Sequence, residues 1–92
     1  MNVGAATTQR RRMLEPRQCR AARALLGWSR ARLAKESGVS APTIDRYERG
    51  ESSPMFSTVA LLRRTMERAG VVFVEPTKDL GPGVILKDGR RP

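Results

Sequence analysis

The stretch LAKESGVSAPTIDRYERG, from Leu33 to Gly50, constrains the fold more than any other part of the chain. It places two short segments, each with apolar residues at helical spacing, on either side of one glycine, Gly38. The second segment begins with Ala41, Pro42 and Thr43, which are smaller than the side chains that a close-packed helix pair requires. The outward surface of this segment is therefore shaped for a neighbour other than protein.

The charge of the chain favours a polyanionic partner. Its 92 residues are enough for one small domain. They include 18 Lys and Arg against 9 Asp and Glu, which gives a net charge of +9 and long-range attraction for polyanions. All the cations except Lys35, Lys78 and Lys87 are arginines, whose planar guanidinium suits phosphates and guanine edges. Nucleic acid is the partner that this composition indicates.

Several other classes of protein are disfavoured by composition. No stretch approaches the roughly 18 apolar residues needed to cross a bilayer, and the N-terminus lacks a secretory apolar region, so we expect a cytoplasmic protein. With no histidine and one cysteine, Cys19, we expect no metal site, and the helical spacing of Cys19 with Ala22 and Leu26 predicts a core position. The acids are spread singly, so we expect neither an enzyme nor a cofactor.

Capping signals predict four helices. Pro16 suits a helix start, and Gly27 ends that helix. Each of the next three starts has a serine as N-cap, preceded by an apolar residue that can clamp on the fourth helical position. These sets are Ser29 with Trp28 and Leu33, Ser40 with Val39 and Ile44, and Ser57 with Phe56 and Leu61. The predicted helices span residues 16–26, 30–37, 41–49 and 58–69, the last three closed by Gly38, Gly50 and Gly70.

The ends of the chain differ from this helical region. Residues 1–14, which include the run Arg10 to Arg12, lack periodicity and predict a mobile basic tail; the arginines either add nonspecific attraction or reach into a minor groove. Within residues 71–88, two β-branched runs, 71–74 and 84–86, predict strands joined by a Pro- and Gly-rich loop. Residues 89–92 are a second short tail. The domain proper is therefore residues 15–70.

Two short helices joined by a tight glycine turn form a helix-turn-helix, whose second helix lies in the DNA major groove. The chain resembles the Cro/C1-type (XRE) helix-turn-helix family over about residues 18–70. The resemblance rests on Leu33-Ala34, Gly38-Val39-Ser40, Ile44, Glu48, Gly50 and Pro54. It implies a mostly α, lambda-repressor-like domain of four helices that binds double-stranded DNA, here followed by the pair of strands.

The resemblance also implies which residues contact DNA. Arg30 stands where the family usually has a phosphate-binding glutamine, and it offers a full charge. Ala41 and Pro42 replace polar base readers and offer only apolar contact, so direct base reading falls on Thr43, Asp45 and Arg46, with Arg46 suited to guanine. The residues assigned to phosphate are Arg23, Arg30, Arg32, Ser40 and Arg49, with Arg49 also near enough in sequence to read bases.

Some of these residues have structural interpretations. In the family, the arginine at Arg23 and the glutamate at Glu48 form a partly buried ion pair. Asp45 and Arg49, four residues apart on a helix, either read DNA or pair with each other. Arg32 stands where a reciprocal cap would need Glu or Gln, which leaves it to phosphate or solvent. Trp28 and Tyr47 are predicted in the core.

One helix-turn-helix reads too few base pairs to find one site in a genome, so we expect a homodimer on a two-fold operator. The strands supply an apolar surface for it, namely Val71, Val72, Phe73, Val74, Val84, Ile85 and Leu86. We therefore expect a sequence-specific transcriptional regulator that acts as a repressor, because no ligand or polymerase-contacting domain fits in the chain. The alternative is an antitoxin or another protein that binds a protein partner and uses the motif for autoregulation.

Overall fold

The computed structural model describes residues 13–87. The predicted Arg10 to Arg12 segment and the predicted tail at residues 89–92 lie outside these residues. Within the described part of the chain, four helices precede two antiparallel strands, so the predicted mostly α architecture is confirmed. The elements are α2 (Pro16–Leu26), α3 (Arg30–Ser37), α4 (Ala41–Glu48), α5 (Phe56–Arg68), β1 (Val71–Val74) and β2 (Gly83–Leu86).

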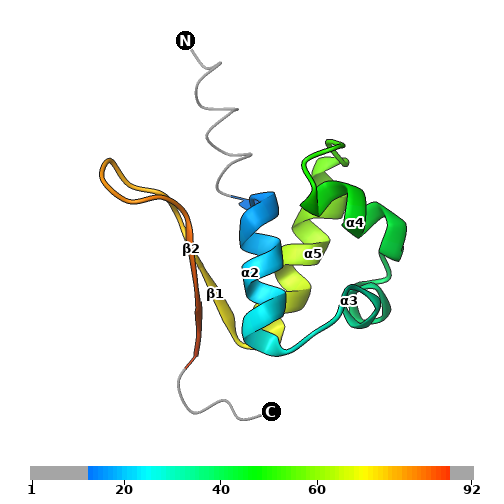
Figure 1. Ribbon diagram of the computed structural model, residues 1–92. Helices are drawn as coiled ribbons and strands as arrows, with labels where there is room; N and C mark the ends of the chain where they lie inside the picture. The colour runs from blue at the N-terminus through cyan, green and yellow to red at the C-terminus, as the bar shows by residue number, and fades with distance from the viewer. Residues whose placement is uncertain (1–12, 88–92) are drawn as a thin grey trace.

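The first and last helices form the centre of the domain (Figure 1). α2 packs against α5, and the pair α3 and α4 lies on one side of them. The hairpin of β1 and β2 lies on the other side, where β2 packs along α2 and β1 contacts α5. The helix-turn-helix pair and the hairpin therefore occupy opposite sides of the molecule.

Two of the three predicted serine caps are confirmed. The hydroxyl of Ser29 accepts a hydrogen bond from the backbone N–H of Arg32 at 3.0 Å, and that of Ser40 accepts one from Thr43 at 3.3 Å. Gly38, with φ of 83°, ends α3 in the left-handed conformation and makes the tight turn to α4.

The third predicted cap, at Ser57, is wrong. The carbonyl of Met55 already accepts the backbone N–H groups of Thr58 and Val59, so α5 begins at Phe56 and Ser57 lies inside its first turn. Phe56 is thus a helical residue, mostly exposed, and cannot act as the residue before the cap. Two helices also end one residue earlier than predicted, α4 at Glu48 and α5 at Arg68.

The core lies between the helices and is closed by β1. Its fully buried side chains include Leu33 and Ile44 from the helix-turn-helix and Leu62 and Met66 from α5. Cys19 and Tyr47 are buried as predicted, and Trp28 packs against the edge of the core. Burial of these apolar side chains, at about 25 cal/mol per Å² of surface removed from water, is the main stabilising contribution.

The ordered domain begins before the predicted boundary. Leu14 is 5% exposed and belongs to the core, and its carbonyl accepts a hydrogen bond from the Tyr47 hydroxyl at 3.0 Å. The carbonyl of Met13 accepts one from Arg63 at 2.8 Å. Assigning Met13 and Leu14 to the mobile tail was therefore wrong, because contacts distant in sequence hold them.

The hairpin has one buried face and one exposed face. Val71 pairs with Leu86 and Val72 with Ile85, and the side chains alternate, so that Val71 and Phe73 enter the core. Val72, Val74 and Ile85 remain exposed. The strands thus pair with each other within one chain, and only the exposed residues of the predicted dimerisation set are free to contact another molecule.

A buried side-chain amide attaches the hairpin to α2. Gln18 is 5% exposed, and its Nε2 donates to the carbonyls of Val74 at 3.2 Å and Gly83 at 3.0 Å, one on each strand. Its Oε1 accepts the backbone N–H of Glu15 at 2.9 Å. All three contacts satisfy polar groups that would otherwise be poorly solvated.

We expect Gln18→Met, which keeps the length of the side chain but removes its hydrogen bonds, to lower the free energy of unfolding by about 1–3 kcal/mol, since two partly buried carbonyls lose their donor. Urea titration measures this loss, and amide exchange should show faster exchange in β1 and β2 than in α5. Arg17→Met is the control, because Arg17 is the exposed neighbour of Gln18. Equal stabilities of the two variants would contradict the prediction.

Candidate nucleic-acid interface

The outward face of α4 contains the residues predicted to read bases. Pro42 and Arg46 are exposed, whereas Ala41, Thr43 and Asp45 are half-buried. The Thr43 hydroxyl accepts a hydrogen bond from the Ser40 hydroxyl at 2.8 Å, which ties both to the helix start. Arg46 makes no ion pair with any of residues 13–87, so its guanidinium is open to an external acceptor.

The position of α4 depends on a buried carboxylate at its C-terminal end. The Glu48 side chain is fully buried and accepts hydrogen bonds from Nε and Nη2 of Arg23, both at 2.8 Å. It also accepts the Cys19 thiol at 3.1 Å and Nε of Arg30 at 3.1 Å. The predicted ion pair of Arg23 and Glu48 is thus confirmed and links α4 to α2, whereas the contact of Glu48 with Arg30 links α4 to α3.

The ionisation of this cluster follows from its contacts. Burial alone would raise the pKa of Glu48, but the hydrogen bonds from Arg23, Cys19 and Arg30 outweigh burial and leave the pKa below its usual value. The hydrogen bond to Glu48 raises the pKa of Arg23. Burial, together with the adjacent carboxylate, raises the pKa of Cys19, which is therefore a neutral donor rather than a reactive thiolate.

A second, outer group of ion pairs surrounds α4. Asp45 Oδ1 lies 3.5 Å from Nε of Arg30 and 3.2 Å from Nε of Arg49, and Arg49 also lies 3.8 Å from Glu51. The alternative in which Asp45 and Arg49 pair with each other is thus observed. The pairing of Arg30 with both Asp45 and Glu48 was not predicted, because these residues lie on two different helices and no spacing along the sequence indicates the contact.

Two further arginines make intramolecular contacts near this surface. Arg32 binds Glu36 at 2.8 Å, and its guanidinium lies over the ring of Trp28, 4.9 Å from the ring centre. Arg20 donates to the main-chain carbonyl of Glu48. Sequence reasoning missed Arg20, although its position one turn before Arg23 on α2 places it on nearly the same helix face.

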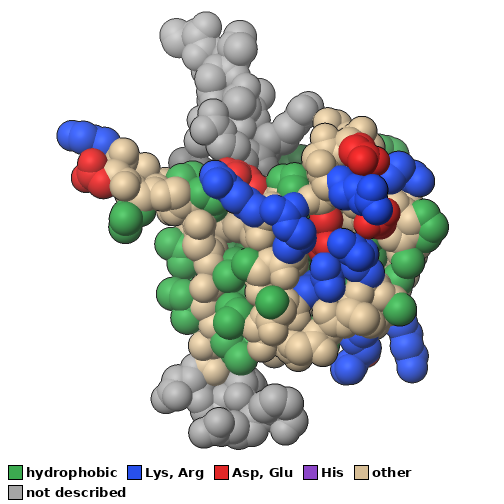
Figure 2. All heavy atoms as spheres, in the orientation of Figure 1, with side chains coloured by type: hydrophobic (Ala, Val, Ile, Leu, Met, Phe, Trp, Pro, Cys, Tyr) green, Lys and Arg blue, Asp and Glu red, His purple; other side chains and the backbone are tan. Residues whose placement is uncertain are grey.

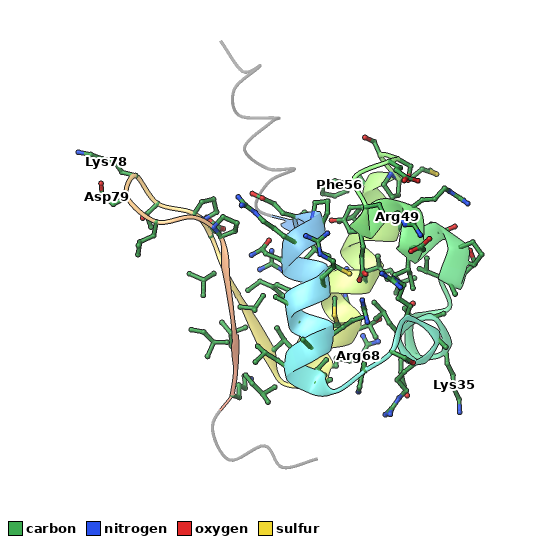
Figure 3. All side chains as sticks on the ribbon, viewed as in Figure 1. Lys35, Arg49, Phe56, Arg68, Lys78 and Asp79 are labelled. Carbon is green, nitrogen blue, oxygen red and sulfur yellow. The ribbon has the colours of Figure 1, made fainter. Side chains whose placement is uncertain are left out.

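Charged and apolar side chains gather on different parts of the surface (Figure 2). In this view, Lys and Arg gather over α2, α3 and α4, with acidic groups among them, whereas hydrophobic side chains follow the hairpin. Figure 3 shows Arg49 beside α4 and Lys35 projecting from α3. Lys35, Arg64 and Arg68 make no ion pair within residues 13–87, and so add net positive charge.

Two further properties concern the described residues alone. None of their helices has the length and apolar character required to cross a membrane. They contain no group of three acidic, cysteine or histidine side chains that is placed to hold a metal ion.

A family model described as helix-turn-helix matches residues 20–68, which is more than half of the chain. The chain belongs to the Cro/C1-type (XRE) helix-turn-helix family. The match extends from α2 to the end of α5 and confirms the resemblance predicted from the sequence. No curated protein matches the chain significantly. The family is one of DNA-binding domains rather than enzymes, so this XRE domain is a DNA-binding transcription regulator.

We expect acid to weaken this XRE domain through Glu48. The folded-state pKa of Glu48 is lowered, so its stabilising effect is complete above the unfolded pKa of about 4.3 and is lost as the pH falls through the folded value. Glu48→Gln should lower the free energy of unfolding at pH 7 by about 3–5 kcal/mol, because Arg23 loses its counter-charge. Between about pH 5 and about pH 3, a range that brackets the unfolded pKa of about 4.3, the free energy of unfolding should fall less for the variant than for the wild type.

Urea titrations across this pH range measure both effects. Glu51→Gln is the control, because Glu51 is exposed and pairs with Arg49 only at 3.8 Å. Its stability should remain within about 0.5 kcal/mol of the wild type at pH 7. The interpretation would be contradicted if stability fell with acid along parallel curves in the wild type and the Glu48 variant.

Proposed function

We propose that the protein is a sequence-specific repressor that binds a two-fold operator as a homodimer, with α4 in the major groove of each half-site. The observation that best supports this function is the position of Arg46. It is exposed on the outward face of α4, and no acid within residues 13–87 neutralises it. A free arginine on a helix with small neighbours matches the requirement for bidentate contact with guanine.

The proposed base contacts divide by chemistry. Arg46 donates to guanine O6 and N7, and the Thr43 hydroxyl, already bonded to Ser40, offers a second polar group. Asp45 is able to accept from a cytosine amino group. Ala41 and Pro42 supply apolar surface for a thymine methyl and allow the helix backbone to come close to the bases.

The proposed phosphate contacts surround this helix. Arg30 is the first residue of α3, and Arg49 directly follows α4. The hydrogen bonds that they donate to protein acids come from Nε, which leaves the terminal nitrogens of Arg30 and Nη2 of Arg49 for phosphate oxygens, while Nη1 of Arg49 lies 3.8 Å from Glu51. Arg23 is only 15% exposed and contributes chiefly by holding Glu48. Arg32 and Ser40 complete the proposed phosphate set.

The exposed face of the hairpin supports the proposed dimer. Val72 and Ile85 are paired across the strands, are 40% and 56% exposed, and stand beside exposed Val74. Burial of this apolar face against a second copy would remove it from water and so stabilise a dimer. This face lies opposite the helix-turn-helix pair, which leaves both copies of α4 accessible to DNA.

We expect selection from a randomised DNA library to yield a two-fold symmetric site with the wild type. Arg46→Ala should relax specificity at one position of each half-site and weaken binding by about 1–3 kcal/mol per half-site. Lys78→Ala is the control, because it also removes one cation but lies at the hairpin tip (Figure 3). If no sequence is enriched, and both variants bind slightly less to every sequence, specific reading through α4 is wrong.

We expect the wild type to sediment as a dimer at micromolar concentration and Ile85→Lys to sediment as a monomer, because a charge would replace an apolar contact at the proposed interface. Leu80→Lys is the control, since Leu80 is exposed in the loop outside the strands. A stable wild-type monomer at this concentration would rule out the homodimer. Together with failure to select a DNA sequence, it would favour the alternative in which the protein is an antitoxin that binds a different protein.

A further inference from the structure

Asp45 occupies an unfavourable place for DNA binding, since a carboxylate on the reading helix repels phosphates. We propose that Asp45 limits sequence-independent binding to DNA by neutralising Arg30 and Arg49, the two arginines that flank the reading helix. This inference rests on the proposed function, because it assigns to one residue of that interface the control of how strongly the domain prefers its operator to other DNA.

The contacts of Asp45 support this role. One oxygen, Oδ1, lies 3.5 Å from Nε of Arg30 and 3.2 Å from Nε of Arg49, and the Asp45 side chain is about one-third exposed. Arg30 comes from the start of α3 and Arg49 from the end of α4. Asp45 therefore faces both proposed phosphate contacts at once.

The local charge balance differs sharply from that of the whole chain. Arg23, Arg30 and Arg49 are paired within 4 Å with the acids Asp45, Glu48 and Glu51. These six groups sum to zero, although the chain has a net charge of +9. The arginines that flank the reading helix are thus neutralised, whereas Arg46 on its outward face and more distant cations such as Lys35 and Arg68 make no ion pair within residues 13–87.

This neutrality affects nonspecific binding more than specific binding. Nonspecific binding depends almost entirely on the release of counterions by protein cations, whereas specific binding adds contacts with base edges. An arginine that already faces a carboxylate keeps its hydrogen-bond donors but contributes little net charge. Arg30 and Arg49 can therefore fix the position of DNA in the operator complex while adding little attraction for other DNA.

The test compares the salt dependence of binding for the wild type and Asp45→Asn, measured by fluorescence anisotropy on a random-sequence duplex and on the selected operator. Each net positive charge that is freed should steepen the slope of log K against log salt by about 0.9, and the loss of one acid frees one such charge, so the variant should gain about 0.9. On the random duplex, this corresponds to roughly eightfold tighter binding per freed cation at 0.1 M salt relative to 1 M. The ratio of operator to random affinity should fall.

Asp79→Asn is the matched control. It makes the same change of charge at the hairpin tip, where Asp79 has no ion pair within residues 13–87 (Figure 3). Its slope should stay near that of the wild type. Adding Arg30→Gln or Arg49→Gln to Asp45→Asn should each remove part of the gained slope.

Two results would overturn the role of Asp45. The first is that Asp45→Asn gives the same slope as Asp79→Asn on the random duplex. The second is that Asp45→Asn binds both duplexes more weakly than the wild type, which would show that Asp45 chiefly positions Arg30 and Arg49. Failure of the proposed function is distinguishable, since a wild type that enriches no sequence rejects specific reading. The random-duplex slopes would still decide whether Asp45 restrains binding.

Discussion

The buried carboxylate of Glu48 is the interaction on which the arrangement of the helices depends. An ionised acid without counter-charges would not remain in the interior, because the loss of hydration costs several kcal/mol. Here two hydrogen bonds from Arg23 and one each from Cys19 and Arg30 replace that hydration. These donors belong to α2 and α3, whereas Glu48 ends α4, so satisfying one charge fixes three helices relative to each other.

The same requirement explains the small residues at the other end of α4. Because Glu48, Tyr47 and Ile44 already hold the helix to the protein, Ala41 and Pro42 need not add packing, and the start of the helix is free to approach another surface. The hairpin is held separately, through Gln18 and the buried side chains of β1. The proposed DNA-binding and self-association surfaces thus depend on different sets of contacts.

Local signals predicted much of this fold, and contacts between distant residues account for most of what they missed. The roles of Ser29, Ser40 and Gly38 depend only on backbone groups close to them in the sequence, so they can be predicted from the sequence alone. Ser57 gave the same signal, but the carbonyl of Met55 started the helix earlier, and a serine is also tolerated inside a first turn. Leu14, Gln18 and Arg30 are held by residues at least 18 positions away, which no spacing rule reveals.

Arg30 contacts both the buried carboxylate of Glu48 and the outer carboxylate of Asp45, so a substitution of Arg30 would affect both ion pairs. Its Nε lies 3.1 Å from Glu48 and 3.5 Å from Asp45, so one guanidinium contacts both the ion pair that holds α4 and the acid beside the proposed DNA surface. Glutamine, the usual residue here in the family, has no charge with which to balance either acid. A phosphate on the terminal nitrogens of Arg30 would share its guanidinium with these acids, which bind Nε, so in the proposed complex DNA affinity and helix position are linked through this residue. Arg46 makes none of these contacts, which leaves its contribution to base reading separable from stability.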